Sequence, residues 1–259
     1  MFKNLRILFL LLILVPLVYA LRLPADPAPD WDQPQRVTIY PVSADASPLV
    51  KRFIDDLDQT DFDALGTYFR RQAQRHGLSA NPPFRFSLGE ELEAAPPIPD
   101  DNLSGLARLR WGITLRWWHW RLSRRYAGTD IVVVARFQQP VDGPIDLHSI
   151  GMASPRLALV SLVADPSMQG LNEVKIAHEL LHTVGASDFY DRYTREPLWP
   201  EGYADAERRP RFPQPAAELM AGRIPVSARR SRQPGALDAT VIGIGTAREI
   251  GWIDRLIAD

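Results

Sequence analysis

The sequence has no cysteine among its 259 residues. This absence excludes disulfide bonds, thiol catalysis, zinc held by cysteine and lipid attachment through cysteine. Histidine is scarce, with five residues, and methionine is scarcer, with four. Any metal site in this chain must therefore take its ligands from a few histidines and from the aspartates and glutamates.

The chain also lacks an excess of charge of either sign. Lys and Arg number 30 and Asp and Glu number 31, so the formal net charge is −1. A charge this close to zero gives no indication of a nucleic-acid partner. The composition, 46% hydrophobic and 24% charged, is that of an ordinary globular protein that can bury a core without a covalent staple.

The N-terminus differs from the rest of the chain. Lys3 and Arg6 precede an uncharged apolar run over residues 7–21, and Ala20 ends a stretch suited to signal peptidase. We predict a signal peptide over residues 1–21, with an uncleaved membrane anchor as the alternative, although the run is short for a span of about 20 residues. Either interpretation predicts export of the remaining chain, as a periplasmic or secreted protein.

A linker rich in proline and aspartate follows over residues 22–35, and we expect one folded domain over residues 36–259. The apolar patterns of this domain predict strands at 36–42, 84–88, 129–137 and 156–163, and helices at 47–76, 102–126 and 171–184. This order predicts an α/β (α+β) fold with a mixed twisted sheet, a long backing helix, an active-site helix and a C-terminal helix.

The predicted helix at 102–126 combines tryptophans with arginines. An apolar stripe runs along one face and consists of Leu106, Leu109, Ile113, Trp117 and Trp120. We expect this stripe to pack on the domain, because apolar stripes at helical spacing usually face a core. The alternative is a helix that lies on a membrane surface, where tryptophan and arginine are both favoured.

The strongest chemical signal is the segment HELLHTVGASD at residues 178–188. On a helix, His178 and His182 lie one turn apart on the same face and can reach a single ion. Glu179 is placed to act on a water held by that ion. Gly185 can end the helix and reverse the chain, and Asp188 can then supply the third ligand that a catalytic zinc requires.

Other acidic residues remain open as the third ligand. Asp191 follows Asp188 closely, and the sequence does not determine the geometry of the turn after Gly185. Glu201 and Glu218 would be the alternatives if the third ligand came from a later helix.

This segment resembles the HExxHxxGxxH motif of the metzincin clan of metallopeptidases, in which the last ligand is sometimes aspartate, as in the snapalysins. The resemblance implies a methionine in a tight turn beneath the zinc, and Met220 is its counterpart here. It also implies that residues 149–163 include the edge strand that pairs with substrate, and that residues 237–252 are similar to the closing helix of matrixin-like members. No familiar signature lies between Asp188 and Met220.

The resulting expectation is a zinc-dependent endopeptidase that acts on proteins or peptides and is a monomer. His178, His182 and Asp188 hold the zinc, and Glu179 serves as general base and acid. Two alternatives belong to other classes of protein. One is an exported zinc-binding module without catalysis, and the other is a membrane-surface protein in which the metal is structural.

Overall fold

The computed structural model describes residues 29–78, 82–99, 104–125, 128–141 and 148–253, together with residues 6, 7, 10, 11 and 14. Most of the predicted signal or anchor at 1–21, and most of the linker at 22–35, lie outside the described residues. Within the described part, no helix combines the length and the apolar content that a membrane crossing needs.

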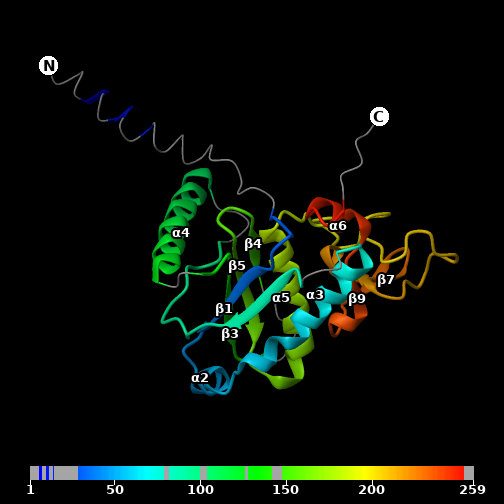
Figure 1. The fold of residues 1–259 in the computed structure, drawn as a ribbon, viewed down its shortest axis with the longest axis horizontal. Coiled ribbons are helices and arrows are strands. Elements are labelled where there is room, and N and C mark those ends of the chain that lie inside the picture. The colour runs from blue at the N-terminus through cyan, green and yellow to red at the C-terminus, as the bar shows by residue number, and fades with distance from the viewer. Residues whose placement is uncertain are drawn as a thin grey trace.

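A five-stranded sheet forms the centre of the molecule (Figure 1), in the order β2-β1-β3-β5-β4. Its four parallel strands are β1 (Gln35–Ser43), β2 (Phe84–Leu88), β3 (Ile131–Gln138) and β5 (Leu157–Val163). The short edge strand β4 (Ile150–Met152) pairs antiparallel with β5. The predicted fold class, a mixed α/β (α+β) fold, is confirmed.

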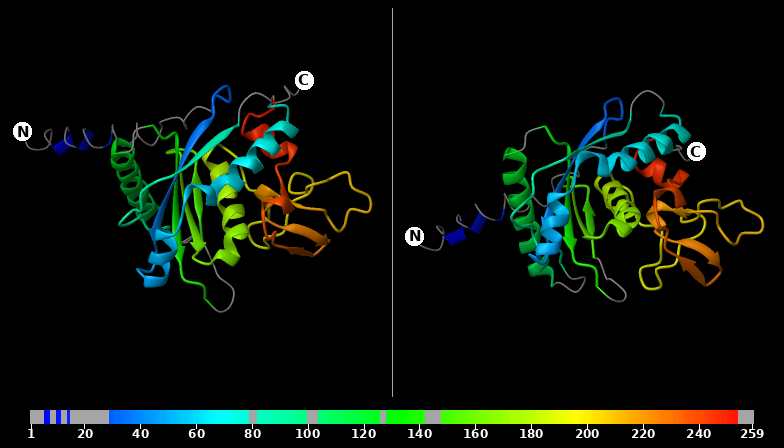
Figure 2. Two further views of the ribbon diagram at one scale, coloured as in Figure 1. Left: turned by 60° about the horizontal axis from the view of Figure 1, so that its bottom comes forward. Right: turned by 90° about the horizontal axis from the view of Figure 1, so that it is seen from below.

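Helices cover both faces of the sheet (Figure 2). Along β3, Val133 and Ala135 belong to one core and Val132 and Val134 to the other, because successive side chains of a strand point to opposite faces. The first core also contains residues of α2 (Pro48–Asp55), α3 (Asp63–Arg75) and α5 (Gln169–Thr183). The second core contains residues of α4 (Gly105–Arg125) alone among the described helices. The molecule therefore has three layers, with α4 and α5 on opposite sides of the sheet.

The single helix predicted at 47–76 is wrong. α2 ends at Asp55, a 3-10 helix η1 (Gln59–Phe62) follows, and α3 begins at Asp63. The side chain of Asp58 accepts a hydrogen bond from the backbone N–H of Thr60, and Asp58 forms a capping box with Asp61. A strong cap begins a new helical segment, so it divides a periodic apolar pattern that would otherwise predict one helix.

The predicted orientation of the 102–126 helix is also wrong. α4 buries Leu115 and Leu122 against the sheet, while Trp117 is 55% exposed and Leu106 is 79% exposed. The helix carries two apolar stripes. The stripe that contains Leu115 and Leu122 fits the alternating residues of β1, β3 and β5, and it displaces the tryptophan stripe to solvent.

The C-terminal part consists of short elements. They are β6 (Ala217–Glu218), the 3-10 helix η3 (Leu219–Ala221), β7 (Ile224–Ser227), β8 (Arg230–Arg232), the 3-10 helix η4 (Leu237–Ala239), β9 (Thr240–Val241) and α6 (Ile244–Glu249). The likeness of residues 237–252 to one closing helix therefore does not hold, because Thr240 and Val241 are extended and pair with β6. Only residues 244–249 are α-helical there.

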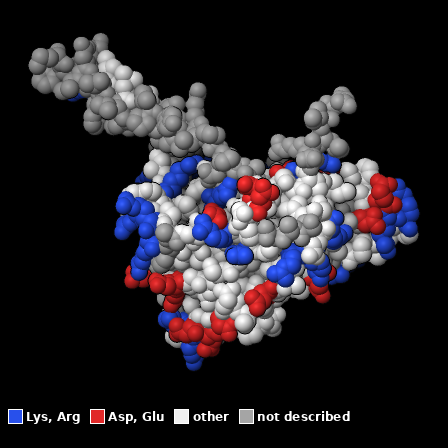
Figure 3. Space-filling model, in the orientation of Figure 1, with Lys and Arg blue, Asp and Glu red and all other residues white. Residues whose placement is uncertain are grey.

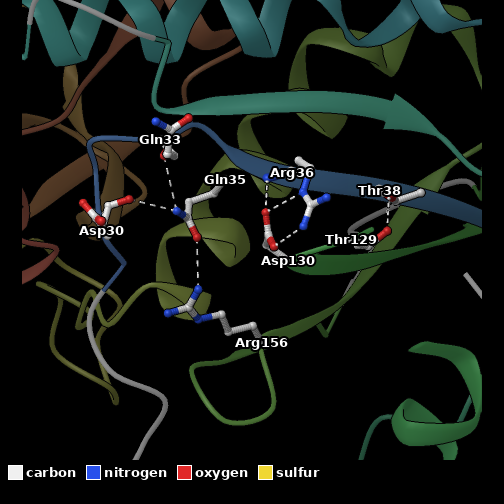
Figure 4. Close-up of polar contacts among 8 residues, drawn as sticks. All are labelled: Asp30, Gln33, Gln35, Arg36, Thr38, Thr129, Asp130 and Arg156. Carbon is white, nitrogen blue, oxygen red and sulfur yellow. Dashed lines mark hydrogen bonds and ion pairs between the residues drawn. The ribbon is translucent and has the colours of Figure 1, made fainter. Parts of the chain in front are cut away.

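Side chains join the start of β1 to the starts of β3 and β5 (Figure 4). The guanidinium group of Arg36 donates to both carboxylate oxygens of Asp130, at 3.0 and 2.8 Å. Arg156, just before β5, donates to Oε1 of Gln35 at 3.0 Å. These contacts hold the N-terminal ends of the parallel strands β1, β3 and β5 together.

Candidate metal centre

α5 carries the histidine motif and is anchored to the sheet on its inner side. Its residues Ile176, Ala177, Leu180 and Leu181 are buried in the first core. Asn172 adds a polar anchor, because its side-chain amide accepts a hydrogen bond from Val163 N and donates one to Val163 O. A helix held in this way presents its opposite face, with the histidines, in one defined orientation.

The turn after α5 is held at two points. Gly185 has a φ of 101°, a left-handed conformation that glycine adopts without a steric penalty. The backbone N–H of Ser187 donates to Oε2 of Glu249 in α6, at 2.7 Å. The backbone N–H of Phe189 donates to the carbonyl oxygen of Met220, at 3.0 Å. These two bonds flank Asp188 and direct its carboxylate back toward α5.

Three predicted ligands meet at this point. Oδ1 of Asp188 lies 3.1 Å from Nε2 of His178 and 3.2 Å from Nε2 of His182. One ligand atom from each of the three residues lies within 4.8 Å of the other two. Ligands at 2.0–2.1 Å from a tetrahedral zinc are separated by about 3.3 Å, so the two short separations match the edges of such a site.

The other ring nitrogens of the two histidines support the same interpretation. Nδ1 of His178 lies 2.9 Å from the carbonyl oxygen of Leu219, and Nδ1 of His182 lies 2.8 Å from that of Ala186. A carbonyl oxygen can only accept, so each Nδ1 carries the hydrogen. In a neutral ring each Nε2 then directs a lone pair at the cluster, as metal-binding histidines do.

The electrostatics of the cluster favour a cation. Burial acts to lower the pKa of His178, but the hydrogen bond to Asp188 and the charge of Glu179 outweigh it and raise this pKa to about 9. Burial also acts to raise the pKa of Asp188, yet the hydrogen bonds from His178 and His182 hold it far below its usual range. The carboxylate thus stays ionised and favours a positive charge on His178.

Glu179 and Tyr190 adjoin the ligands. Glu179 is 9% exposed, and its charge acts to raise the pKa of both His178 and Tyr190. The pKa of Tyr190 is raised to about 12 by burial, by the charge of Asp188 and by a hydrogen bond to that carboxylate. The sequence analysis missed Tyr190. Its one signal was its place two residues after the expected third ligand.

The alternative ligands have other partners. The carboxylate of Asp191 accepts hydrogen bonds from the backbone N–H groups of Tyr193 and Thr194 in its own loop. Neither Asp191 nor Glu201 belongs to the ligand group found among the described residues. Among the described residues, Asp188 is therefore the acidic candidate that the fold brings to the two histidines.

Glu218 is also outside the ligand group and holds the turn that contains Met220. Its carboxylate is fully buried and accepts hydrogen bonds from Ala221 N at 3.0 Å, Gly243 N at 3.1 Å and the hydroxyl of Thr246 at 2.6 Å. Met220 itself is fully buried within this turn. The carbonyl oxygen of Leu219 in this turn accepts the hydrogen bond of His178. Glu218 therefore stabilises the turn that orients this histidine.

The edge strand β4 passes close to α5. A Cβ atom added to Gly151 would collide with the carbonyl oxygen of Glu179 and would lie 2.7 Å from Cβ of His182. Only glycine permits this approach, and glycine inside a strand often marks a close contact of this kind. The sequence analysis expected the edge strand but did not identify this role of Gly151.

Comparison of the chain with protein-family models and with curated proteins found no match.

Proposed function

We propose that this protein is a zinc-dependent endopeptidase of metzincin-like architecture. His178, His182 and Asp188 hold the metal, and Glu179 is the general base and acid. The observation that carries the proposal is the convergence of two histidine Nε2 atoms on Oδ1 of Asp188, with both Nδ1 atoms bound to backbone carbonyls. Two imidazoles and a carboxylate are a donor set that zinc accepts in catalytic sites.

His178, His182 and Asp188 would hold a zinc ion, which would supply Lewis acidity to polarise a carbonyl and to lower the pKa of water to about 7. The carboxylate of Glu179 takes a proton from the attacking water and later delivers it to the departing amine nitrogen. The hydroxyl of Tyr190 stays protonated at neutral pH, and in the proposed reaction it exchanges its hydrogen bond to Asp188 for one to the oxygen that gains negative charge.

The substrate backbone would lie along β4, the edge strand of the described sheet. An edge strand has N–H and C=O groups on one side that no neighbouring strand pairs, and an extended peptide can add there as a further strand. Because Gly151 of β4 touches the helical turn with Glu179 and His182, a peptide on this edge would run past the ligands.

The test compares wild type with Glu179→Gln on a mixture of unfolded proteins, with cleavage followed by mass spectrometry. Wild type cleaves, and Glu179→Gln keeps its zinc but loses cleavage by at least about a hundredfold, within the usual range for a general base. Glu201→Gln is the matched control and retains activity. Full activity in Glu179→Gln, or in wild type stripped of metal, would disprove the mechanism.

The runner-up function is an exported zinc-binding module without catalysis. It shares the metal ligands but gives no role to Glu179, whose charge acts on His178, or to Tyr190, whose hydroxyl hydrogen-bonds to Asp188. Both observations favour the enzyme. A zinc-loaded wild type that cleaves no protein in the mixture would favour this alternative.

A further inference from the structure

The outward face of α4 presents an apolar stripe together with basic side chains. Four of its large apolar residues are exposed by about half or more: Leu106, Ile113, Trp117 and Trp120. At 100° per residue they fall within one narrow sector, directly opposite the buried Leu115 and Leu122. We refer to Leu106, Ile113, Trp117 and Trp120, with Arg110, Arg121 and Arg124 among and beside them, as the outer face of α4.

The charge on this helix has one sign. α4 contains six arginines and no acidic residue. Two of the arginines cover the exposed indoles, because the guanidinium carbon of Arg121 lies 4.8 Å from the ring centre of Trp117 and that of Arg124 lies 5.0 Å from Trp120. Figure 3 shows Lys and Arg side chains gathered over α4 in a molecule whose overall charge is nearly balanced.

An apolar groove adjoins this face. It has a volume of about 540 Å³ and lies between the proline-rich loop at 94–99 and α4. Trp111, Trp117 and Trp118 form its helical wall, and its lining is almost entirely apolar. Trp117 therefore belongs both to the groove and to the outer face of α4. The exposed apolar stripe is thus continuous with an apolar groove.

We propose that the outer face of α4 binds the surface of an anionic lipid bilayer, with the helix parallel to the membrane plane. Indole rings and basic side chains on one side of a helix are the chemistry of the interface between headgroups and acyl chains. The indoles enter the acyl boundary, and the arginines pair with headgroup phosphates. The face extends for about 30 Å along a straight helix, which suits a planar surface better than a compact acidic partner.

The position of α4 is compatible with catalysis at such a surface. α4 covers one face of the sheet, and α5 with its ligands covers the other. A membrane bound at α4 therefore leaves the metal centre directed away from the lipid. This proposal does not depend on the peptidase assignment, because none of its residues belongs to the metal centre.

The test uses the full chain and vesicles that contain lipids with brominated acyl chains, which quench tryptophan emission on contact. Vesicles of phosphatidylcholine alone are compared with vesicles that also contain phosphatidylglycerol. Wild type is quenched on the anionic vesicles, and added salt weakens the effect because it screens the arginines. Trp117→Phe combined with Trp120→Phe removes the quenched emission, which assigns it to the outer face of α4.

Substitution of the arginines of α4 gives a more specific test than substitution of the tryptophans. Arg110→Gln, Arg121→Gln and Arg124→Gln together lower the affinity of α4 for anionic vesicles about a hundredfold, on the basis of about fivefold for each basic residue near the surface. The matched control is Arg229→Gln, Arg230→Gln and Arg232→Gln, in and beside β8, which changes the net charge equally and leaves the quenching unchanged. Quenching that persists in the tryptophan variant, is equal in both triple variants, or is absent on anionic vesicles would overturn the proposal.

Discussion

Nδ1 of His178 lies 2.9 Å from the carbonyl oxygen of Leu219, a residue 41 positions further along the chain. This contact joins the first metal-ligand candidate to the turn that contains Met220. It makes the orientation of the imidazole ring depend on a distant segment, so the stability of that turn affects the geometry of the candidate metal centre.

Glu218 provides the first test of this dependence. In Glu218→Gln, an amide NH₂ replaces one of the two oxygens that accept hydrogen bonds, and it faces a backbone or hydroxyl donor instead. We expect a loss of about 1–3 kcal/mol in the free energy of unfolding, because a buried donor loses its partner. Urea denaturation measures it, and the exposed Glu207→Gln is the control. Equal stability of the two variants would contradict the role of Glu218.

Gly151 tests the contact between β4 and α5. Gly151→Ala places a methyl group against the carbonyl of Glu179 and Cβ of His182, so we expect a loss of about 1–3 kcal/mol in unfolding free energy and weaker metal binding. The matched control is Gly112→Ala in α4, where no atom lies within 4 Å of an added Cβ. That substitution should stabilise the protein by about 0.5–1 kcal/mol. Effects of the same sign in both variants would refute the close approach.

Asp130 and Arg36 give the pH prediction. Hydrogen bonds from Arg36 hold the pKa of Asp130 below its usual value, against the opposing effect of burial. The unfolded state therefore binds the proton more readily, so the contribution of the pair is complete above the unfolded pKa of about 3.9 and is lost as pH falls through the lower folded pKa. We therefore expect the free energy of unfolding, measured from pH 2 to pH 7, to be larger for wild type than for Asp130→Asn near pH 7. The two values should converge toward pH 2.

Arg36→Gln serves as the partner variant in that experiment. It removes the same ion pair from the other side, so its pH profile should match that of Asp130→Asn, and the double variant should lose little more than either single variant. A difference between wild type and Asp130→Asn that stays constant across the pH range would show that ionisation of Asp130 contributes nothing.

Tyr190 tests the catalytic role that we propose for a residue that is not itself a metal ligand. Tyr190→Phe removes the phenolic hydrogen bond donor and retains the ring, so we expect kcat to fall about a hundredfold or more while zinc content and KM stay near wild type. Steady-state kinetics on a cleaved peptide, with zinc measured in the same preparation, separates the two effects. An unchanged kcat would remove Tyr190 from the mechanism.

The sequence was sufficient where the signal is local. The strand at 84–88 has the predicted bounds, and the β-branched run at 131–138 forms the predicted buried strand. α5 ends one residue before its predicted end, with Gly185 in the left-handed conformation. In each case, neighbouring residues determine the structure through periodicity or a cap.

The predictions failed where distant contacts decide. α4 has two apolar stripes of comparable strength, and only the sheet determines that Leu115 rather than Trp117 is buried. The roles of Glu218 and Gly151 depend on contacts with residues about 25 to 30 positions away, which no local pattern reports. The choice between Asp188 and Asp191 as third ligand depends on the loop after Gly185, where backbone N–H groups of the loop itself bind the carboxylate of Asp191.

The most direct test of the central proposal is the metal content of the purified protein, measured by inductively coupled plasma mass spectrometry. Wild type is compared with Asp188→Ala and with Asp191→Ala, each shown to be folded by circular dichroism. We predict about one zinc for each chain in wild type and in Asp191→Ala, and far less in Asp188→Ala. Folded wild type without zinc, or equal zinc in all three proteins, would contradict the three-ligand site.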